Sequence, residues 1–133
     1  MPRLLDSTFL VDFLRRQEEA RRLVERMEAE GERLFTTEIN AFEVFLGAYP
    51  KGRLDHRRFA KAVGLLSRLH VLGLDRAGVI EAAEIAGSLH ASGRSIGVLD
   101  ILTAGIARAA GCKTIVTRDQ DFRRIPGLKV ETY

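Results

Sequence analysis

The sequence predicts an α/β fold in which helices cover both faces of a central parallel sheet. Short apolar runs alternate with longer segments that carry apolar residues at helical spacing, and parallel strands need such helical crossovers between them. The hydrophobic fraction of 46% and the charged fraction of 29% are ordinary for a folded protein. No repeat or low-complexity linker interrupts the 133 residues, so we expect one domain over residues 1–133.

The predicted elements alternate from the first strand to the last. Residues 3–5 form an apolar run that ends at Asp6, and Ser7 or Thr8 is suited to cap a helix that continues to residue 15. The other predicted strands cover residues 33–36, 70–74, 114–117 and 128–131. The other predicted helices cover residues 18–30, 38–49, 55–69, the segment from a cap at Asp75 to residue 92, and 97–110.

Glycine, proline and hydroxyl residues mark the ends of these elements. Gly31 and Gly111 follow two of the helices, in the position where a left-handed backbone ends a helix. Thr37 is an N-cap for the helix that follows it, and residues 50–52 (Pro-Lys-Gly) break that helix. Residues 126–127 (Pro-Gly) predict a turn before the last strand.

Charge and cysteine content exclude some classes of protein and leave others open. The 21 basic and 18 acidic residues give a formal charge of +3, which permits a nucleic-acid partner without demanding one. The single cysteine, Cys112, excludes an intrachain disulfide and a cysteine-rich zinc site. We find no signal peptide and no apolar stretch of membrane-spanning length, so we expect a cytoplasmic protein without a membrane partner.

Four carboxylates occupy positions where a solvated acid is not expected. Asp6 follows the first strand directly, and Asp119 follows the strand that the sequence predicts most clearly, residues 114–117. Glu43 falls on a helical stripe of apolar side chains, and Asp100 is the only acid in the apolar helix 97–110. Each has a structural alternative: a helix cap for Asp6, an ion pair for Glu43, an ion pair or a helix cap for Asp100, and a turn for Asp119. The apolar members of the stripe, which we expect to point inward, are Ile39, Phe42 and Leu46.

Taken together, the four positions predict a metal site. In an open parallel sheet, reactive groups gather beyond the carboxyl ends of the strands. Like charges that converge there raise one another's pKa, and a bound divalent cation removes this repulsion. Oxygen ligands favour Mg²⁺ or Mn²⁺ over zinc, and such sites serve phosphoryl chemistry. The sequence has neither a Walker loop nor a GxSxG motif, which makes a phosphodiester the expected substrate.

Three segments resemble the PIN-domain family, and within it the VapC-type toxins. They are LLDSTFLVDFL with Asp6, TTEINAFEVFLGAY with Glu43, and IGVLDILTAGIARAAGCKTIVTRDQDFRRIPGLKV with Asp100 and Asp119. The resemblance covers essentially the whole chain in the same order, and the third segment is its most specific part. It implies a three-layer α/β/α sandwich, Mg²⁺ or Mn²⁺ in the acidic pocket, and endonucleolytic cleavage of RNA.

The resemblance also implies roles for individual residues. The catalytic and metal-binding acids correspond to Asp6, Glu43, Asp100 and Asp119, and Asp121 is an alternative ligand because many relatives have a longer turn here. The side chains expected to support the site by hydrogen bonding are those of Ser7, Thr8 and Thr117. Cleavage of RNA also needs positive charge around the acids. The side chains that we expect at this rim are those of Arg94, Arg118 and Arg123.

A VapC-type chain is expected to bind an antitoxin protein and to form a homodimer. The aromatic side chains that could line a groove for the antitoxin are Phe9, Phe13, Phe42, Phe45 and Tyr49, although core packing is the simpler explanation for each. Three alternatives stay open. A receiver-like phosphoacceptor domain would need paired acids after the first strand, where Asp6 stands alone. A PIN nuclease without a toxin role and a catalytically silent PIN-like binding module are the others.

Overall fold

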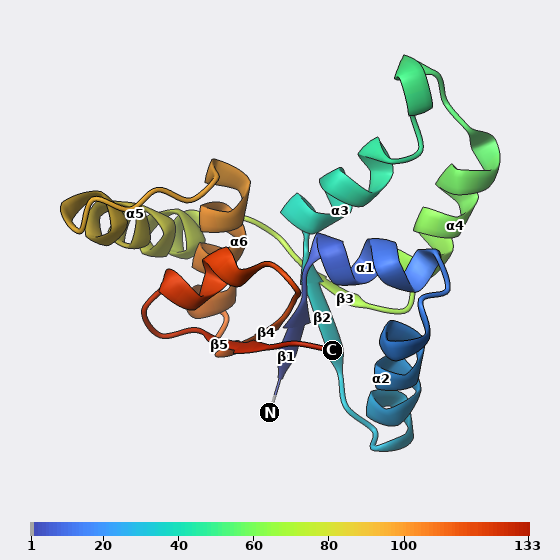
Figure 1. Ribbon diagram of the computed structural model, residues 1–133, viewed down its shortest axis with the longest axis horizontal. Coiled ribbons are helices and arrows are strands. Elements are labelled where there is room, and N and C mark those ends of the chain that lie inside the picture. The colour runs from blue at the N-terminus through green and yellow to red at the C-terminus, as the bar shows by residue number, and fades with distance from the viewer. Residues whose placement is uncertain (1) are drawn as a thin grey trace.

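The computed structural model describes residues 2–133, which contain one five-stranded sheet. Its strands are β1 (Arg3–Leu5), β2 (Leu34–Thr37), β3 (His70–Leu72), β4 (Thr114–Val116) and β5 (Lys129–Glu131). The order across the sheet is β3-β2-β1-β4-β5, and every neighbouring pair runs parallel (Figure 1). This confirms the predicted parallel architecture and places the carboxyl ends of the strands at one edge of the sheet.

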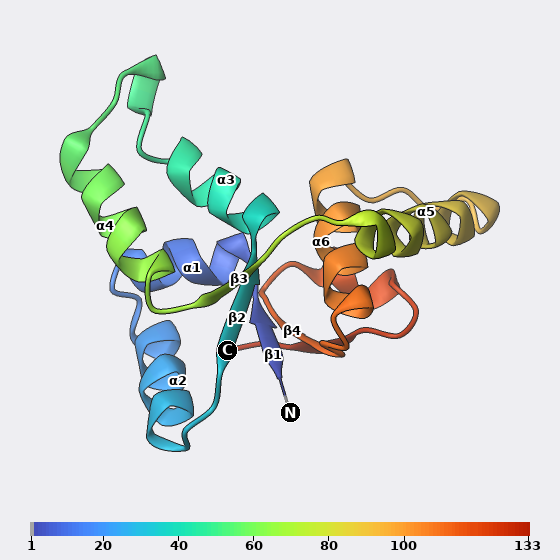
Figure 2. The ribbon, with the colours of Figure 1, turned by 180° about the vertical axis from the view of Figure 1, so that it is seen from behind.

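Six α-helices cover the two faces of the sheet within residues 2–133. The helices on one face are α1 (Ser7–Leu14), α2 (Glu18–Ala29), α3 (Glu38–Leu46) and α4 (His56–Leu66). Those on the other face are α5 (Arg76–Ala91) and α6 (Val98–Ala109), accompanied by the short 3₁₀ helix η2 (Gln120–Arg124). Figures 1 and 2 show the two groups on opposite sides of the sheet. None of the helices in these residues has the length and apolar composition needed to cross a membrane.

Side chains that alternate along the neighbouring strands β1 and β4 build a separate core on each face of the sheet. Leu5 of β1 and Val116 of β4 pack with α1–α4, whereas Leu4 and Ile115 pack with α5, α6 and η2. All four side chains are at most 1% exposed. Because β1 and β4 are buried on both faces of the sheet, they carry consecutive apolar residues instead of alternating apolar and polar ones.

Helix α3 is shorter than predicted: it ends at Leu46, whereas the sequence predicted a helix up to Tyr49. Tyr49 precedes Pro50, and the proline ring disfavours a helical backbone at the preceding residue. The chain then forms the 3₁₀ turn η1 (Pro50–Gly52) before α4. Helices α3 and α4 therefore form a hairpin that projects from the rest of the chain (Figures 1 and 2).

The buried face of α3 is also not the predicted one. Its buried residues are Asn40, Ala41 and Val44. Phe42 is 54% exposed and Leu46 is 58% exposed, so the predicted inward stripe that contained them is wrong. Ala41 and Val44 suffice to pack α3 against the sheet, which leaves the larger apolar side chains on the surface.

Polar side chains cap two helices where capping residues were predicted. Thr37 and Asp75 accept hydrogen bonds from the first turns of α3 and α5. Asp55, predicted as the first residue of a helix, is instead the N-cap of α4 and accepts a hydrogen bond in the same way. In α1, the N-cap is Asp6 in place of Ser7 or Thr8. Its carboxylate accepts a hydrogen bond from the backbone N–H of Phe9 at 3.1 Å. Asp6 is thus a helix cap, which leaves open whether it also belongs to a site.

Helices α5 and α6 approach each other so closely that only glycine fits at position 105. A Cβ atom there would lie 2.6 Å from the carbonyl oxygen of Gly78 and 2.7 Å from the backbone of Ala82. We expect Gly105→Ala to lower the free energy of unfolding by about 1–3 kcal/mol, because backbone atoms must shift. Gly87→Ala, in an open position on α5, should instead raise it by about 0.5–1 kcal/mol. Urea unfolding of both variants checks this, and equal stability of the two would contradict it.

Candidate metal and catalytic site

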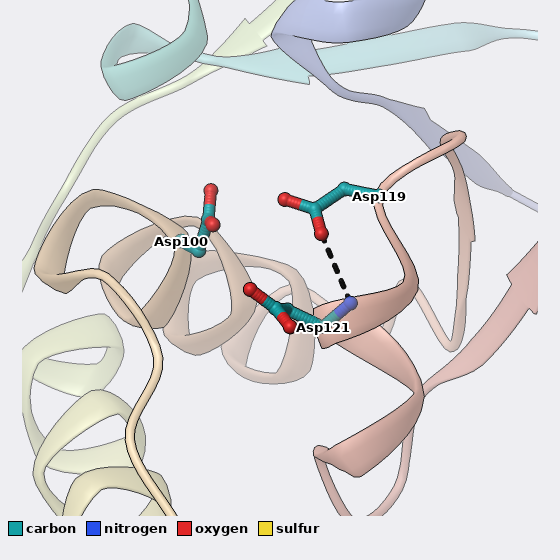
Figure 3. A group of neighbouring side chains, drawn as sticks. All are labelled: Asp100, Asp119 and Asp121. Atoms are coloured by element: carbon teal, nitrogen blue, oxygen red, sulfur yellow. Dashed lines mark hydrogen bonds between the residues drawn. The ribbon is translucent and has the colours of Figure 1, made fainter.

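Three carboxylates converge between the start of α6 and the segment after β4. Asp100 lies in the first turn of α6, Asp119 caps η2, and Asp121 lies in its first turn. One carboxylate oxygen from each lies within 4.8 Å of the other two. Figure 3 shows the three side chains directed into the same space. Both candidates for the fourth position, Asp119 and Asp121, therefore lie beside Asp100.

Backbone hydrogen bonds fix the turn that carries two of these acids. The N–H of Asp121 donates to the carboxylate of Asp119 at 2.9 Å (Figure 3). The N–H of Asp119 donates to the hydroxyl oxygen of Thr117 at 2.9 Å. The turn was predicted for this segment, and its bonds explain how Asp119 can serve as a cap and still present one oxygen to Asp100.

Asp6 lies at the carboxyl end of the neighbouring strand β1 and is 2% exposed. Its carboxylate accepts hydrogen bonds from the hydroxyl groups of Thr117 at 2.6 Å and Thr8 at 2.7 Å, in addition to the N–H of Phe9. Because Thr117 also accepts from the N–H of Asp119, a single hydroxyl group connects the ends of β1 and β4.

Glu43 approaches the same edge of the sheet from α3. It is partly buried, and its carboxylate accepts a hydrogen bond from the hydroxyl of Ser7 at 2.9 Å. The structure therefore places all three predicted supporting hydroxyl groups against predicted acids, those of Ser7, Thr8 and Thr117.

Ion pairing does not account for these acids. Among residues 2–133, the salt bridges include none formed by Asp6, Glu43, Asp100 or Asp119. Asp121 has one contact, at 3.7 Å from Arg124. The structural alternative of a buried ion pair for Glu43 or Asp100 is therefore wrong for the described part of the chain. The acids form a cluster of like charges instead.

The pKa values of Asp100 and Asp6 are raised in this cluster. Burial, followed by the charges of Asp119, Glu43 and Asp6, raises the pKa of Asp100 from its usual 3.8 to about 7. Burial also raises the pKa of Asp6 to about 6, against the opposing effect of its hydrogen bonds from Thr117, Phe9 and Thr8. Asp100 thus responds to acids from β1, α3 and the turn after β4, which means that they share one electrostatic environment.

The donor set fits a hard divalent cation. The converging groups are carboxylate oxygens and they are partly buried, and among the described residues the contact between Asp121 and Arg124 at 3.7 Å is their one ion pair. Mg²⁺ and Mn²⁺ are bound in proteins by a few carboxylates together with water. Asp100, Asp119 and Asp121 are placed to hold such an ion, and Asp6 and Glu43 lie close enough to raise the pKa of Asp100.

The three arginines predicted at the rim differ in their surroundings. Arg94 lies exposed in the connection between α5 and α6, and Arg123 lies exposed on η2. Arg118 also faces solvent, but its guanidinium donates to the main-chain oxygen of Tyr133 at 3.3 and 3.1 Å. It also lies over the ring of Tyr133, at 4.4 Å from the centroid. Arg118 is therefore already engaged by another part of the chain.

The five aromatic residues proposed to line a groove do not share one surface. Phe9 is completely buried, and Phe13 and Phe45 pack against the same core. The prediction is therefore wrong for Phe9, whose first-turn position on α1 directs it inward. Phe42 and Tyr49, at 54% and 43% exposed, remain available to a partner.

Sequence reasoning missed two buried polar side chains, those of Asn40 and Thr103. Asn40 is 2% exposed and accepts hydrogen bonds from the hydroxyl groups of Thr36 and Thr37 at 3.4 and 2.8 Å. The available signal was a pair of threonines at a strand end with an asparagine three residues later. Thr103, one turn after Asp100, has a buried hydroxyl group that has no hydrogen-bond partner within residues 2–133.

A parallel α/β sheet with carboxylates gathered at its carboxyl edge is typical of the class of metal-dependent phosphodiester hydrolases. Comparison with known proteins supports a nuclease. The profile of the PIN domain matches residues 3–128. The chain therefore belongs to the PIN-domain family, as the resemblance of its sequence predicted.

Similar proteins within this family include VapC proteins. The tRNA(fMet)-specific endonuclease VapC of Salmonella typhimurium is 30% identical over 109 residues, which are 82% of each chain. The structure of DNA-bound VapBC from Salmonella typhimurium has a TM-score of 0.87 at 28% identity, covering 99% of this chain and 98% of that one. VapBC2 from Rickettsia felis, bound to a DNA fragment from its promoter, has a TM-score of 0.89 at 24% identity, covering 100% and 99%. The receiver-like alternative is therefore wrong.

Proposed function

We propose that this chain is a Mg²⁺- or Mn²⁺-dependent endoribonuclease that acts as the toxin of a toxin–antitoxin pair. The observation that carries the proposal is the convergence of Asp100, Asp119 and Asp121, of which only Asp121 has an ion pair among the described residues, a 3.7 Å contact with Arg124. Family membership supports the reaction class, because the VapC of Salmonella typhimurium is named as an endonuclease specific for tRNA(fMet).

In this proposal the acids divide their roles according to their surroundings. Asp100, Asp119 and Asp121 hold the cation, and Asp6 and Glu43 complete the negative charge around it. When bound, the cation supplies positive charge for the scissile phosphate and lowers the pKa of water. The hydroxyl group of Thr117 fixes the position of Asp6 relative to the turn of Asp119, because it donates to the Asp6 carboxylate and accepts from the N–H of Asp119.

Binding of an RNA substrate needs positively charged side chains that do not already interact with another part of the chain. Arg94 and Arg123 are exposed on segments next to Asp100 and Asp121, so we assign them to contacts with RNA phosphates. Because such contacts do not read bases, the RNA target must be selected by its shape or by a loop. A formylmethionine initiator tRNA is the first substrate to examine, since the Salmonella relative carries that specificity in its name.

An antitoxin partner follows from the same relatives. Solved structures similar to this chain include the VapBC complexes of Rickettsia felis and Salmonella typhimurium. On this chain, exposed apolar side chains on the α3–α4 hairpin offer a surface for a protein partner or for a second copy. They are Phe42, Leu46, Tyr49, Leu54, Phe59 and Val63. Homodimer formation stays a prediction, and light scattering of the purified chain measures it.

Calorimetric titration tests the metal site directly. We expect Mn²⁺ to bind the purified chain saturably, and we expect Asp100→Asn to remove or greatly weaken this binding because the substitution deletes one ligand charge. Asp55→Asn is the matched control, since asparagine also caps helices and Asp55 lies at the start of α4. Absence of Mn²⁺ and Mg²⁺ binding by the wild-type chain would favour a silent binding module. Cation binding without cleavage of any RNA would favour a non-nuclease role.

A further inference from the structure

Tyr133 and Arg118 connect helix α1 with the turn that carries Asp119. We propose that these two residues form a clamp that holds this turn in the geometry that binds the cation. The inference rests on the proposed function, because it assigns two positioning residues to the same acidic site. It also explains why an arginine beside the acids is turned toward another part of the chain.

One half of the clamp is the interaction of Arg118 with Tyr133. The Nε and one terminal nitrogen of Arg118 both donate to the main-chain oxygen of Tyr133, at 3.3 and 3.1 Å. The guanidinium carbon lies 4.4 Å from the centroid of the tyrosine ring. Two hydrogen bonds and a stacked ring restrict a planar guanidinium in a way that the single ammonium of lysine does not reproduce.

The other half fastens Tyr133 to α1. Its hydroxyl group donates to the carboxylate of Asp12 at 2.6 Å, and its ring meets that of Phe9 edge to face with centroids 4.8 Å apart. Burial and the neighbouring Asp12 raise the pKa of Tyr133 well above its usual value, so the phenol remains a proton donor at neutral pH. Tyr133 is thus held by both its polar and its apolar groups.

The two halves close a ring of contacts around the site. Phe9, which packs on Tyr133, also donates its N–H to Asp6. Asp6 accepts from the hydroxyl of Thr117, and that hydroxyl accepts from the N–H of Asp119. Arg118 lies between Thr117 and Asp119 in the chain, so its anchorage fixes the same turn from the outer side. The geometry therefore makes Arg118 a positioning residue and not a contact for RNA.

Manganese titration and amide exchange test the clamp in the full chain. We expect Arg118→Lys to weaken Mn²⁺ binding about ten-fold, the size of effect found when groups that orient metal ligands are lost. Tyr133→Phe keeps the ring and deletes one hydrogen bond, so its effect should have the same direction and be smaller. In the metal-free protein, the amide protons of Asp119 and Asp121 should exchange faster in both variants.

Matched substitutions separate the clamp from its alternatives. Arg26→Lys and Tyr49→Phe make the same chemical changes at exposed positions outside the acidic site and should keep the wild-type Mn²⁺ affinity and exchange rates. If Arg118→Lys keeps both quantities and raises only the KM for RNA, Arg118 contacts substrate and the clamp is overturned. A lower melting temperature with unchanged exchange at the turn also overturns it. Absence of Mn²⁺ binding by the wild type contradicts the proposed function, and amide exchange then decides on the clamp alone.

Discussion

In the Asp100→Asn variant, we expect RNA cleavage to fall below detection while the protein remains folded. Asparagine has nearly the shape of aspartate, so it preserves the packing of the first turn of α6. It removes the charge that would hold a cation jointly with Asp119 and Asp121, whose oxygens lie within 4.8 Å. Cleavage of initiator tRNA and of total RNA, measured with Mg²⁺ and with Mn²⁺, checks this expectation.

Stability separates a catalytic from a structural role for Asp100. Because Asp100 is surrounded by other acids, the neutral amide should make the metal-free variant at least as stable as the wild type. A variant that loses both cleavage and several kcal/mol of stability would identify Asp100 as a structural residue. Asp6→Asn is a poorer test, because Asp6 also caps α1 and accepts from two hydroxyl groups. Asp55→Asn should cleave RNA at the wild-type rate.

The metal-free protein is expected to lose stability as the pH rises from about 4 to about 7. The pKa of Asp100 is raised to about 7 and that of Asp6 to about 6, from 3.8. Between these values the folded state binds more protons than the unfolded state, so the free energy of unfolding falls with increasing pH and changes little above pH 7 from this cause. Urea unfolding in EDTA at pH 5 and pH 8 measures the effect.

Two comparisons isolate the acidic cluster from the other titrating groups. The stability advantage of Asp100→Asn over the wild type should be larger at pH 8 than at pH 5, because only the wild type carries the deprotonated Asp100. Mn²⁺ should stabilise the wild type at pH 8, since it binds the folded state in preference to the unfolded chain. An advantage that does not change with pH would show that Asp100 keeps an ordinary pKa.

The layers and the order of elements could be predicted because local signals were strong. Apolar residues at positions 4–5 and 115–116 indicated buried strands, and Asp55 and Asp75 indicated where two helices begin. The outward face of α3 could not be predicted, because hydrophobic periodicity does not tell which of two apolar stripes packs on the sheet. Phe42 and Leu46 are more hydrophobic than Ala41, yet Ala41 is the buried residue.

The candidate acids could be named from the sequence because each interrupts an apolar context. Their grouping could be only partly predicted. Asp121 was an alternative to Asp119, whereas the structure places both beside Asp100. The contacts of Tyr133 with Asp12 and Arg118 gave no sequence signal, since they join residues 121 and 15 positions apart through side chains that are ordinary on a surface.

The pairing of β1 with β4 has a consequence for the synthesis of the protein. Arg3 pairs with Thr114, and Leu5 with Val116, so the first strand finds this partner only when most of the chain exists. A chain still emerging from the ribosome carries Asp6 and Glu43 long before it carries Asp119 and Asp121. Contacts between such distant residues also form slowly. The acidic site can therefore assemble only after β4 and the turn that carries Asp119 and Asp121 have been synthesised.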